Sequence, residues 1–200
     1  MIVLITGATG LVGQELVNLL LQNGHNVHYL STSKSKLVTN TNYKGFYWNP
    51  KKAEIDTNAL TDVEVIIHLA GANVAKKWTT AYKEEIIESR VLSTQLLYQT
   101  LQKNSHQVKQ IISASAVGIY PDSLTDIYHE TDLDIDVSFL GNVVKQWENE
   151  VSQFEKLEII VSKIRIGIVL AKNGGALQEM AKPIQYGVGA AFGSGEQYQS

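Results

Sequence analysis

The chain contains no cysteine and very little arginine. Without cysteine among its 200 residues, disulfide bonds and thiolate catalysis are excluded, although this absence does not identify a cellular compartment. A net charge of −3 gives no positive excess to attract nucleic acid or an anionic membrane, so neither is an expected partner. Among 17 basic residues only Arg90 and Arg165 are arginine, so the places of these two are informative.

The chain also lacks a secretory signal and a metal-binding motif. Its first residues have no basic stretch or cleavage site and their apolar run is too short to cross a bilayer, so we expect a cytoplasmic protein. The five histidines show no metal-ligand spacing, and His68 is expected to pack within a strand. The acids between Asp122 and Asp136 predict a solvated loop or lid, so no metal is expected. We interpret Trp78 and Trp147 as helix-packing anchors rather than base-stacking platforms.

Short apolar runs alternate with stretches of helical periodicity along the chain. The pattern predicts strands at residues 2–6, 25–30, 45–48, 63–71, 108–115 and 157–170, and helices at 11–23, 79–104, 138–155 and 176–186. Buried strands that alternate with helices form parallel sheets covered on both faces. The sequence therefore predicts an α/β protein with a doubly wound parallel sheet.

A glycine-rich turn, "GATGLVG", follows the first predicted strand and opens the first predicted helix. Gly7 would allow the tight turn, Gly10 would let the backbone approach a pyrophosphate, and Gly13 would permit close packing of helix on strand. A bare structural turn is the alternative. The position of the turn in the alternating pattern favours dinucleotide binding.

The residues after the second strand carry hydroxyl and ammonium groups. No acid occurs between Glu15 and Glu54, although an NAD site usually has one about 20 residues after the glycine turn to bind the ribose 2′-hydroxyl. The stretch instead offers Ser31, Thr32, Ser33, Lys34 and Lys36. These groups suit a 2′-phosphate, which favours NADP over NAD, with a solvated Lys/Ser loop as the alternative.

Several longer segments resemble one known family. They include "LITGATGLVGQELVNLLLQNGH", "VIIHLAGANVAKKWTTAYKEEIIESRVLSTQLL" and "KIRIGIVLAKNGGAL". They resemble the atypical extended short-chain dehydrogenase/reductases, catalogued as NAD-dependent-epimerase-like or nucleoside-diphosphate-sugar epimerase proteins. The resemblance implies a Rossmann domain followed by a smaller substrate domain. It predicts an NAD(P)-binding domain at 1–172, the start of a truncated C-terminal substrate-binding region at 173–200, and a natural chain that continues past Ser200.

The resemblance also implies which positions bind the cofactor. They are Gly7, Thr9, Gly10, Leu11, Val12 and Gly13 in the pyrophosphate loop, Leu69, Ala70 and Gly71 after the fourth strand, Arg90 on the next helix, Ser113 and Ala114 on the fifth strand, and Arg165 on the sixth. Many relatives have Asn at the position of Arg90. Relatives often bind the 2′-phosphate with an Arg after the second strand, a role that Lys34 or Lys36 would take here.

The catalytic pattern of the family is incomplete. Extended members use a Ser or Thr after the fifth strand with a Tyr-x-x-x-Lys pair, and Ser115 matches the Ser. With Glu148 as the anchor of the alignment, Leu140 and Val144 stand at the Tyr and Lys positions. Tyr120 is the remaining candidate acid/base, with Ser115 orienting a substrate hydroxyl. The alternatives are a backbone-bonded hydroxyl for Ser115 and a packing or lid role for Tyr120.

Two functional hypotheses follow from the sequence. The first is an NADP-binding short-chain dehydrogenase/reductase-like protein, an epimerase or oxidoreductase acting on a sugar nucleotide or another small substrate, with a homodimer as one expected assembly. The second is a non-catalytic protein that senses NADP(H) and acts through partners. Leu140 and Val144 keep the second hypothesis open.

Overall fold

Seven strands form one sheet in the part of the chain that the computed structural model describes, residues 1–171, 174–190 and 195. Their spatial order is β4 (Glu54–Ile55), β3 (Tyr43–Asn49), β2 (Asn26–Ser31), β1 (Ile2–Thr6), β5 (Val63–His68), β6 (Gln110–Ala116) and β7 (Ile160–Ile166). All pairs are parallel except β3 with β4. The order reverses between β1 and β5, which opens a crevice at the carboxyl ends of these strands. The Rossmann-type doubly wound sheet is thereby confirmed.

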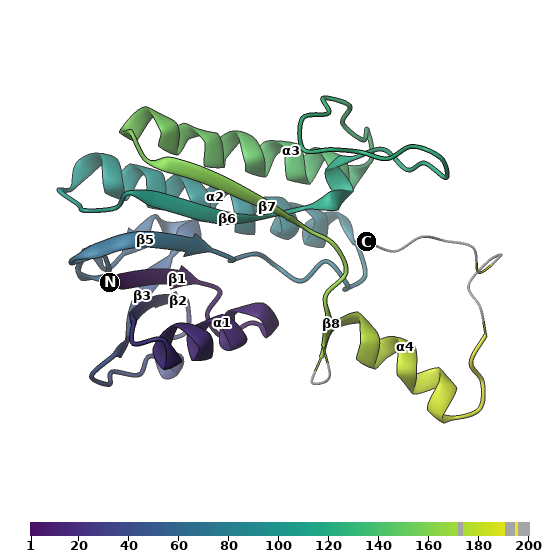
Figure 1. Cartoon of the computed structure of the whole chain (residues 1–200), viewed down its shortest axis with the longest axis horizontal. Helices are drawn as coiled ribbons and strands as arrows, with labels where there is room; N and C mark the ends of the chain where they lie inside the picture. Colours follow the sequence, from purple (N-terminus) through teal and green to yellow (C-terminus); the bar gives the residue numbers. More distant parts are fainter. Residues whose placement is uncertain (172–173, 191–194, 196–200) are drawn as a thin grey trace.

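Helices cover the two faces of the sheet unequally (Figure 1). Helix α1 (Leu11–Gln22) lies on one face, and α2 (Thr80–Lys103) and α3 (Phe139–Ser152) lie side by side on the other. Alternate residues of β1 therefore enter different cores: Leu4 packs on the α2 side, whereas Val3 and Ile5 pack on the α1 side. Both faces of the central strands are buried, as the unbroken apolar run of β1 predicts.

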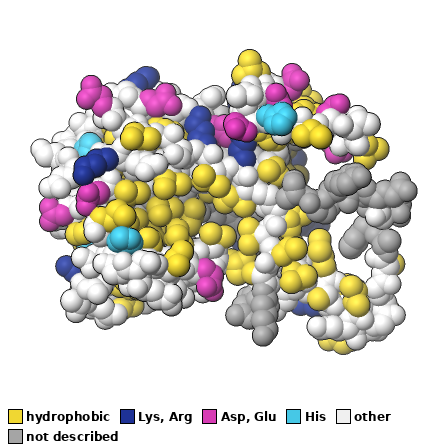
Figure 2. Space-filling view, in the orientation of Figure 1, with side chains coloured by type: hydrophobic (Ala, Val, Ile, Leu, Met, Phe, Trp, Pro, Cys, Tyr) yellow, Lys and Arg dark blue, Asp and Glu magenta, His cyan; other side chains and the backbone are white. Residues whose placement is uncertain are grey.

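On one face of β7, no helix of the described residues covers the sheet. On β7, Ile160 is 65% exposed and Ile164 is 52% exposed. Figure 2 shows hydrophobic side chains gathered over this part of the sheet. They lie on the same face as α1, which covers only the first strands of the sheet. Strand β7 therefore carries apolar side chains that the described residues leave exposed.

Some predicted boundaries are wrong. The single strand expected at 157–170 is divided: β7 ends at Ile166, and β8 (Leu170–Ala171) instead pairs with residues 174–175, at the start of α4 (Gly175–Gln185). The strand expected to reach Gly71 ends at His68: the Leu69 amide still donates to the Thr6 carbonyl, but the Ala70 amide donates to the Thr6 hydroxyl. Helix α4 confirms the helix predicted near 176–186. Residues 172–173 lie outside the described residues, so the domain boundary stays a prediction.

Among the described residues, no helix combines the length and apolar content needed to cross a membrane. That same part of the chain holds no group of three or more His, Asp or Glu side chains arranged to bind a metal ion.

Candidate functional site: a dinucleotide cleft at the carboxyl ends of the strands

The glycine turn between β1 and α1 has little room for side chains. Gly7 has a φ of +74°, and a Cβ there would lie 2.9 Å from the Leu69 carbonyl carbon. A Cβ on Gly13 would lie 2.2 Å from the Gly7 carbonyl oxygen, whereas one on Gly10 would lie 3.2 Å from it. Gly7 therefore serves the turn and Gly13 serves close packing, in agreement with the sequence prediction.

The first turn of α1 is free of side-chain caps. Thr79 caps α2 and Ser138 caps α3 with their hydroxyls, but α1 begins at Gly10 with no side-chain cap and no acid in its first turn. Amide groups at an uncapped helix start are hydrogen-bond donors, and the helix dipole adds positive potential there. This helix start is suited to an anion.

A cleft of about 470 Å³ opens beside the glycine turn, at the point where the strand order reverses. Eight predicted cofactor residues line it: Gly7, Thr9, Ser31, Thr32, Ser33, Lys36, Ala70 and Gly71. They come from the ends of β1, β2 and β5, so elements distant in the sequence converge on one cavity. Its size and mixed polar and apolar walls are those of a small-molecule site.

Other predicted cofactor residues lie outside the lining of the cleft. They are Gly10, Leu11, Val12 and Gly13 on the α1 side, Lys34 after β2, Leu69, Arg90, Ser113, Ala114 and Arg165. The two lysines after β2 are thus separated. Lys36 lines the cleft, but the Lys34 ammonium lies 4.9 Å from the centroid of the Tyr47 ring. Only one of the two candidates for a 2′-phosphate contact faces the cavity.

Sequence reasoning missed one wall of the cleft. Lys51, Glu85 and Glu88 line it, together with Leu30, Trp48, Asn49, Pro50, Ala72, Ser89 and Ser93. The Lys51 ammonium lies 2.5 Å from Glu85 and 3.1 Å from Glu88, and these hydrogen bonds raise the pKa of Lys51. The cleft therefore contains acids, although the sequence has none between Glu15 and Glu54. Both carboxylates of this wall are paired with Lys51.

A buried hydrogen-bond chain joins the loops that border the cleft. The Thr6 hydroxyl accepts from the Leu69 and Ala70 amides, each at 3.1 Å, so its own proton is left for His68 Nδ1 at 2.7 Å. The neutral imidazole then carries its proton on Nε2, which donates to Thr94 Oγ1 at 3.0 Å. Burial and the nearby charge of Arg90 lower the pKa of His68 to about 3. As predicted, His68 is a packed strand residue, and it fixes the end of β5.

Arg90 lies directly behind Gly71. A Cβ on Gly71 would be 3.0 Å from the guanidinium carbon of Arg90, which also lies 5.2 Å from the Trp147 ring centroid. The guanidinium donates to the carbonyls of Ile86 and Ala72, and no carboxylate of the described residues lies within 4.0 Å of it. Burial lowers the pKa of Arg90, but a guanidinium stays charged at neutral pH. It is an unneutralised cation close to the cleft.

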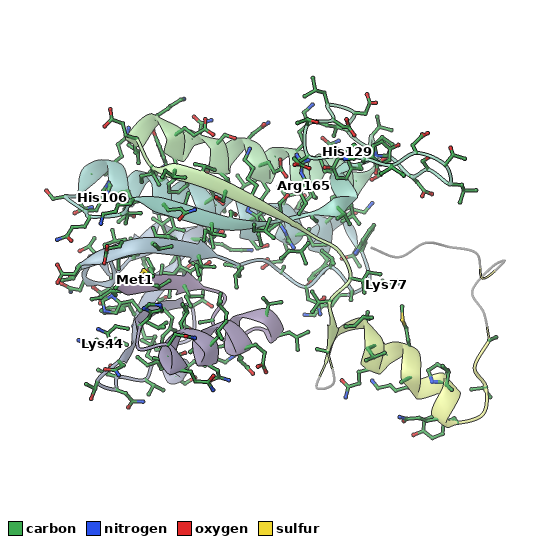
Figure 3. The ribbon with its side chains drawn as sticks, viewed as in Figure 1. Met1, Lys44, Lys77, His106, His129 and Arg165 are labelled. Atoms are coloured by element: carbon green, nitrogen blue, oxygen red, sulfur yellow. The ribbon has the colours of Figure 1, made fainter. Side chains whose placement is uncertain are left out.

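The other arginine is neutralised within a separate cluster. Arg165 donates to both carboxylate oxygens of Glu148, at 3.0 and 3.1 Å, and to the Tyr120 hydroxyl at 2.5 Å. The Ser115 hydroxyl also donates to Glu148, at 2.5 Å, and Tyr120 donates to the His129 carbonyl. Figure 3 shows Arg165 and His129 at the end of the sheet opposite Met1. The candidate catalytic residues Ser115 and Tyr120 thus lie together but outside the cleft lining.

The Glu148 carboxylate is held in its charged form. Burial would raise the pKa of Glu148, but the hydrogen bonds from Arg165 and Ser115 and the charge of Arg165 bring that pKa below its ordinary value. Val144, at the expected Lys position on the same helix, is 3% exposed and packs in the interior. Lys145 is exposed, and Leu140 is half-buried. The structure therefore puts no ammonium group at the expected Lys position.

The two tryptophans predicted as packing anchors differ. Trp147 is 5% exposed and packs against Ala114 and Val151, as predicted. Trp78 is 41% exposed, but its ring also packs edge-on against Phe139, the first residue of α3, so it contacts a helix as predicted. Its indole N–H donates to the Val74 carbonyl within the loop after β5, which orients the ring while leaving much of it open to solvent.

The glycine turn, the uncapped start of α1 and the cleft at the strand reversal together define a Rossmann fold of the kind that binds dinucleotides. The chain belongs to the NAD dependent epimerase/dehydratase family, whose sequence profile matches residues 3–138.

Comparisons with individual proteins support this assignment. An epimerase family protein of Staphylococcus aureus is 37% identical over 98% of this chain. The chain spans 65% of the length of that relative. The human epimerase family protein SDR39U1 (isoform 2), solved with NADPH, superposes with a TM-score of 0.80 at 27% identity, over 100% of this chain and 64% of the human one. A nucleoside-diphosphate sugar epimerase from Corynebacterium glutamicum gives 0.78 at 30% identity, over 98% and 39%.

Proposed function

We propose that this chain binds NADP(H) in the cleft beside the glycine turn, as the cofactor-binding part of an epimerase or oxidoreductase that acts on a sugar nucleotide. The observation that carries the proposal is the cleft itself, where Gly7 and Thr9 of the glycine turn meet the polar residues after β2. The similar human protein was solved with NADPH, and a similar bacterial protein is described as a nucleoside-diphosphate sugar epimerase.

The residues present fit a dinucleotide. The pyrophosphate would lie at the uncapped start of α1, where Gly7 and Gly13 keep the backbone clear of side chains. The adenosine 2′-phosphate would lie among Ser31, Thr32 and Lys36, because these groups donate hydrogen bonds to an anion and none of them repels it. When bound, a nicotinamide dinucleotide supplies hydride transfer.

The charge of Arg90, which lies directly behind Gly71, also favours binding of NADP(H) in the cleft. Its charge has no acid partner among the described residues, and only the absence of a side chain on Gly71 lets it lie so close to the cavity. A cation in a partly desolvated position favours binding of an anionic ligand nearby. We expect Arg90→Met to weaken binding of NADPH and NADH by similar factors, since both carry the pyrophosphate.

Direct binding measurements test the cofactor proposal. NADPH is expected to bind at least about tenfold more tightly than NADH in a fluorescence titration, a difference equivalent to about 1.4 kcal/mol. Equal affinities for the two would contradict the assignment of the residues after β2 to a 2′-phosphate.

One observation favours the second candidate function, a non-catalytic NADP(H)-sensing protein. Ser115 and Tyr120 are engaged by Glu148 and Arg165, while Leu140 and Val144 stand where the family has its Tyr and Lys. Turnover distinguishes the two functions. NADPH oxidation with a panel of carbonyl compounds and sugar nucleotides, lost in Ser115→Ala, supports an enzyme, whereas NADPH binding with no turnover supports a sensor.

A further inference from the structure

The loop after β5 presents an exposed aromatic ring at the carboxyl end of the sheet. Trp78 is 41% exposed, and its indole nitrogen is bonded to Val74, so the ring has a defined orientation. The ring packs edge-on against Phe139, with 5.4 Å between centroids. Since Phe139 is the first residue of α3, two elements far apart in the sequence build one aromatic surface.

Three lysines without acid partners lie near Trp78 in the sequence: Lys76 and Lys77 precede it in the loop, and Lys83 lies on the first turn of α2. The Lys83 ammonium lies 5.0 Å from the Phe139 ring centroid, and the Lys76 ammonium lies 5.4 Å from that of Tyr82. Within the described residues, neither these two lysines nor Lys77 has a carboxylate within 4.0 Å. Asp136 precedes Phe139 by three residues, but its carboxylate accepts hydrogen bonds from Ser138. None of the three lysines is therefore neutralised by a direct ion pair within the described residues.

The loop that carries Trp78 begins at the candidate cofactor cleft. Gly71 and Ala72 line the cleft, and the loop continues directly from them to Trp78. Phe139 precedes Leu140, the position where the family has its catalytic Tyr. Figure 3 shows Lys77 at the same end of the sheet as Arg165, with Met1 and His106 at the opposite end. A ligand on this surface would be close to the space beyond Gly71.

We propose that Trp78, Phe139, Lys76, Lys77 and Lys83 form a binding surface, here called the Trp78 shelf, for the nucleoside diphosphate part of a sugar nucleotide. The base stacks on the open face of Trp78, since every nucleobase has a flat face that stacks on an aromatic ring. The diphosphate lies among the lysine ammonium groups, which attract it electrostatically. This inference rests on the proposed function in one respect, that the substrate is a sugar nucleotide.

Tryptophan fluorescence tests the shelf because the other two tryptophans are hidden. Trp48 is 3% exposed and Trp147 is 5% exposed, so the neutral quencher acrylamide reports mainly on Trp78. We expect UDP-glucose and UDP to reduce acrylamide quenching at least about twofold, with no effect from glucose alone. UDP-glucose that binds the protein without changing the quenching would overturn the proposal.

Variants give a second readout by calorimetry. Trp78→Leu is expected to weaken UDP-glucose binding about tenfold, because base stacking on an aromatic ring is lost, and Trp78→Tyr should restore most of it. The double variant Lys77→Gln, Lys83→Gln should weaken binding and reduce its salt dependence. Lys44→Gln, a change of the same charge at the other end of the sheet, is the control. Unchanged affinity in Trp78→Leu would overturn the proposal.

NADPH titrations of the same proteins separate this inference from the proposed function. NADPH binding without any UDP-glucose binding would reject the Trp78 shelf and leave the cofactor proposal standing. UDP-glucose binding that depends on Trp78, in a protein that binds no NADPH, would support the shelf and reject the cofactor proposal.

Discussion

Arg165 forms a two-pronged ion pair with Glu148, through hydrogen bonds of 3.0 and 3.1 Å from β7 to α3. Glu148 is 7% exposed, and its carboxylate also accepts a hydrogen bond from Ser115. The pair therefore ties the last strand of the parallel sheet to the helix that covers it. Removing Arg165 would leave the buried Glu148 carboxylate without compensation, and removing Glu148 would leave the half-buried guanidinium without its counter-charge.

Glu148→Gln is expected to lower the free energy of unfolding by about 2–4 kcal/mol at neutral pH, because Arg165 loses its counter-charge. Urea unfolding measures this change. Glu64→Gln is the matched control, since Glu64 pairs with Lys109, whose side chain is 73% exposed, and the loss of this pair should change stability little. Equal losses in the two variants would contradict the structural role of the Arg165–Glu148 pair.

The same carboxyl gives a pH dependence. The pKa of Glu148 is lower in the folded protein than in the unfolded chain, so its contribution is complete above the ordinary carboxyl value of about 4.3. The contribution is lost as the pH falls through the folded pKa. Wild-type protein should therefore lose more stability than Glu148→Gln over this acid range, and parallel curves would contradict the assignment.

His68 is expected to stay neutral throughout the physiological pH range. Its folded pKa of about 3 lies below the unfolded value of about 6.5, so the unfolded chain binds a proton that the folded protein does not. Stability should fall as the pH drops from about 6.5 towards 3, by at most about 1.4 kcal/mol per pH unit from this group. Nitrogen-15 NMR should show the proton on Nε2, and a proton on Nδ1 would contradict the hydrogen-bond chain through Thr6.

The glycines of the turn should respond differently to alanine. Gly13→Ala puts a Cβ 2.2 Å from the Gly7 carbonyl oxygen, so we expect a loss of several kcal/mol in stability or failure to fold. Gly10→Ala meets the same oxygen at 3.2 Å, so the protein should fold but bind NADPH more weakly. Thermal unfolding and NADPH titration measure the two effects. A stable Gly13→Ala protein would show that the packing of α1 on β1 is looser than the structure has it.

The sequence predicts much of this fold because its signals are local. The apolar runs at β1 and β5 are long enough to mark buried strands, and Gly24, with a φ of +75°, ends α1 where expected. The strand expected at 157–170 was wrong because its apolar residues continue past Gly167, while the hydrogen-bonded ladder with β6 ends at Ile166. An apolar run in the sequence indicates which residues favour burial. Where the hydrogen-bonded ladder ends depends on the partner strand.

The candidate site was less predictable because it depends on which elements meet. Residue type made Lys34 and Lys36 equal candidates, but the short helical turn at 34–36 sends only Lys36 into the cleft. Glu85 on α2 pairs with Lys51, which lies 34 residues earlier in the sequence, and no local spacing indicates this pair. Trp78 packs against Phe139 of α3, and no local spacing in the sequence indicates that this loop and this helix meet.

Charge removal at Lys36 tests the central claim most directly, with Lys34 as an internal control. The two lysines share one short segment and one charge, but Lys36 lines the cleft and Lys34 lies over Tyr47. In titrations with NADPH and NADH, Lys36→Gln should weaken NADPH binding about tenfold and leave NADH binding unchanged, while Lys34→Gln changes neither appreciably. Equal effects of the two substitutions, or an equal loss for NADPH and NADH in Lys36→Gln, would contradict a 2′-phosphate site at the end of β2.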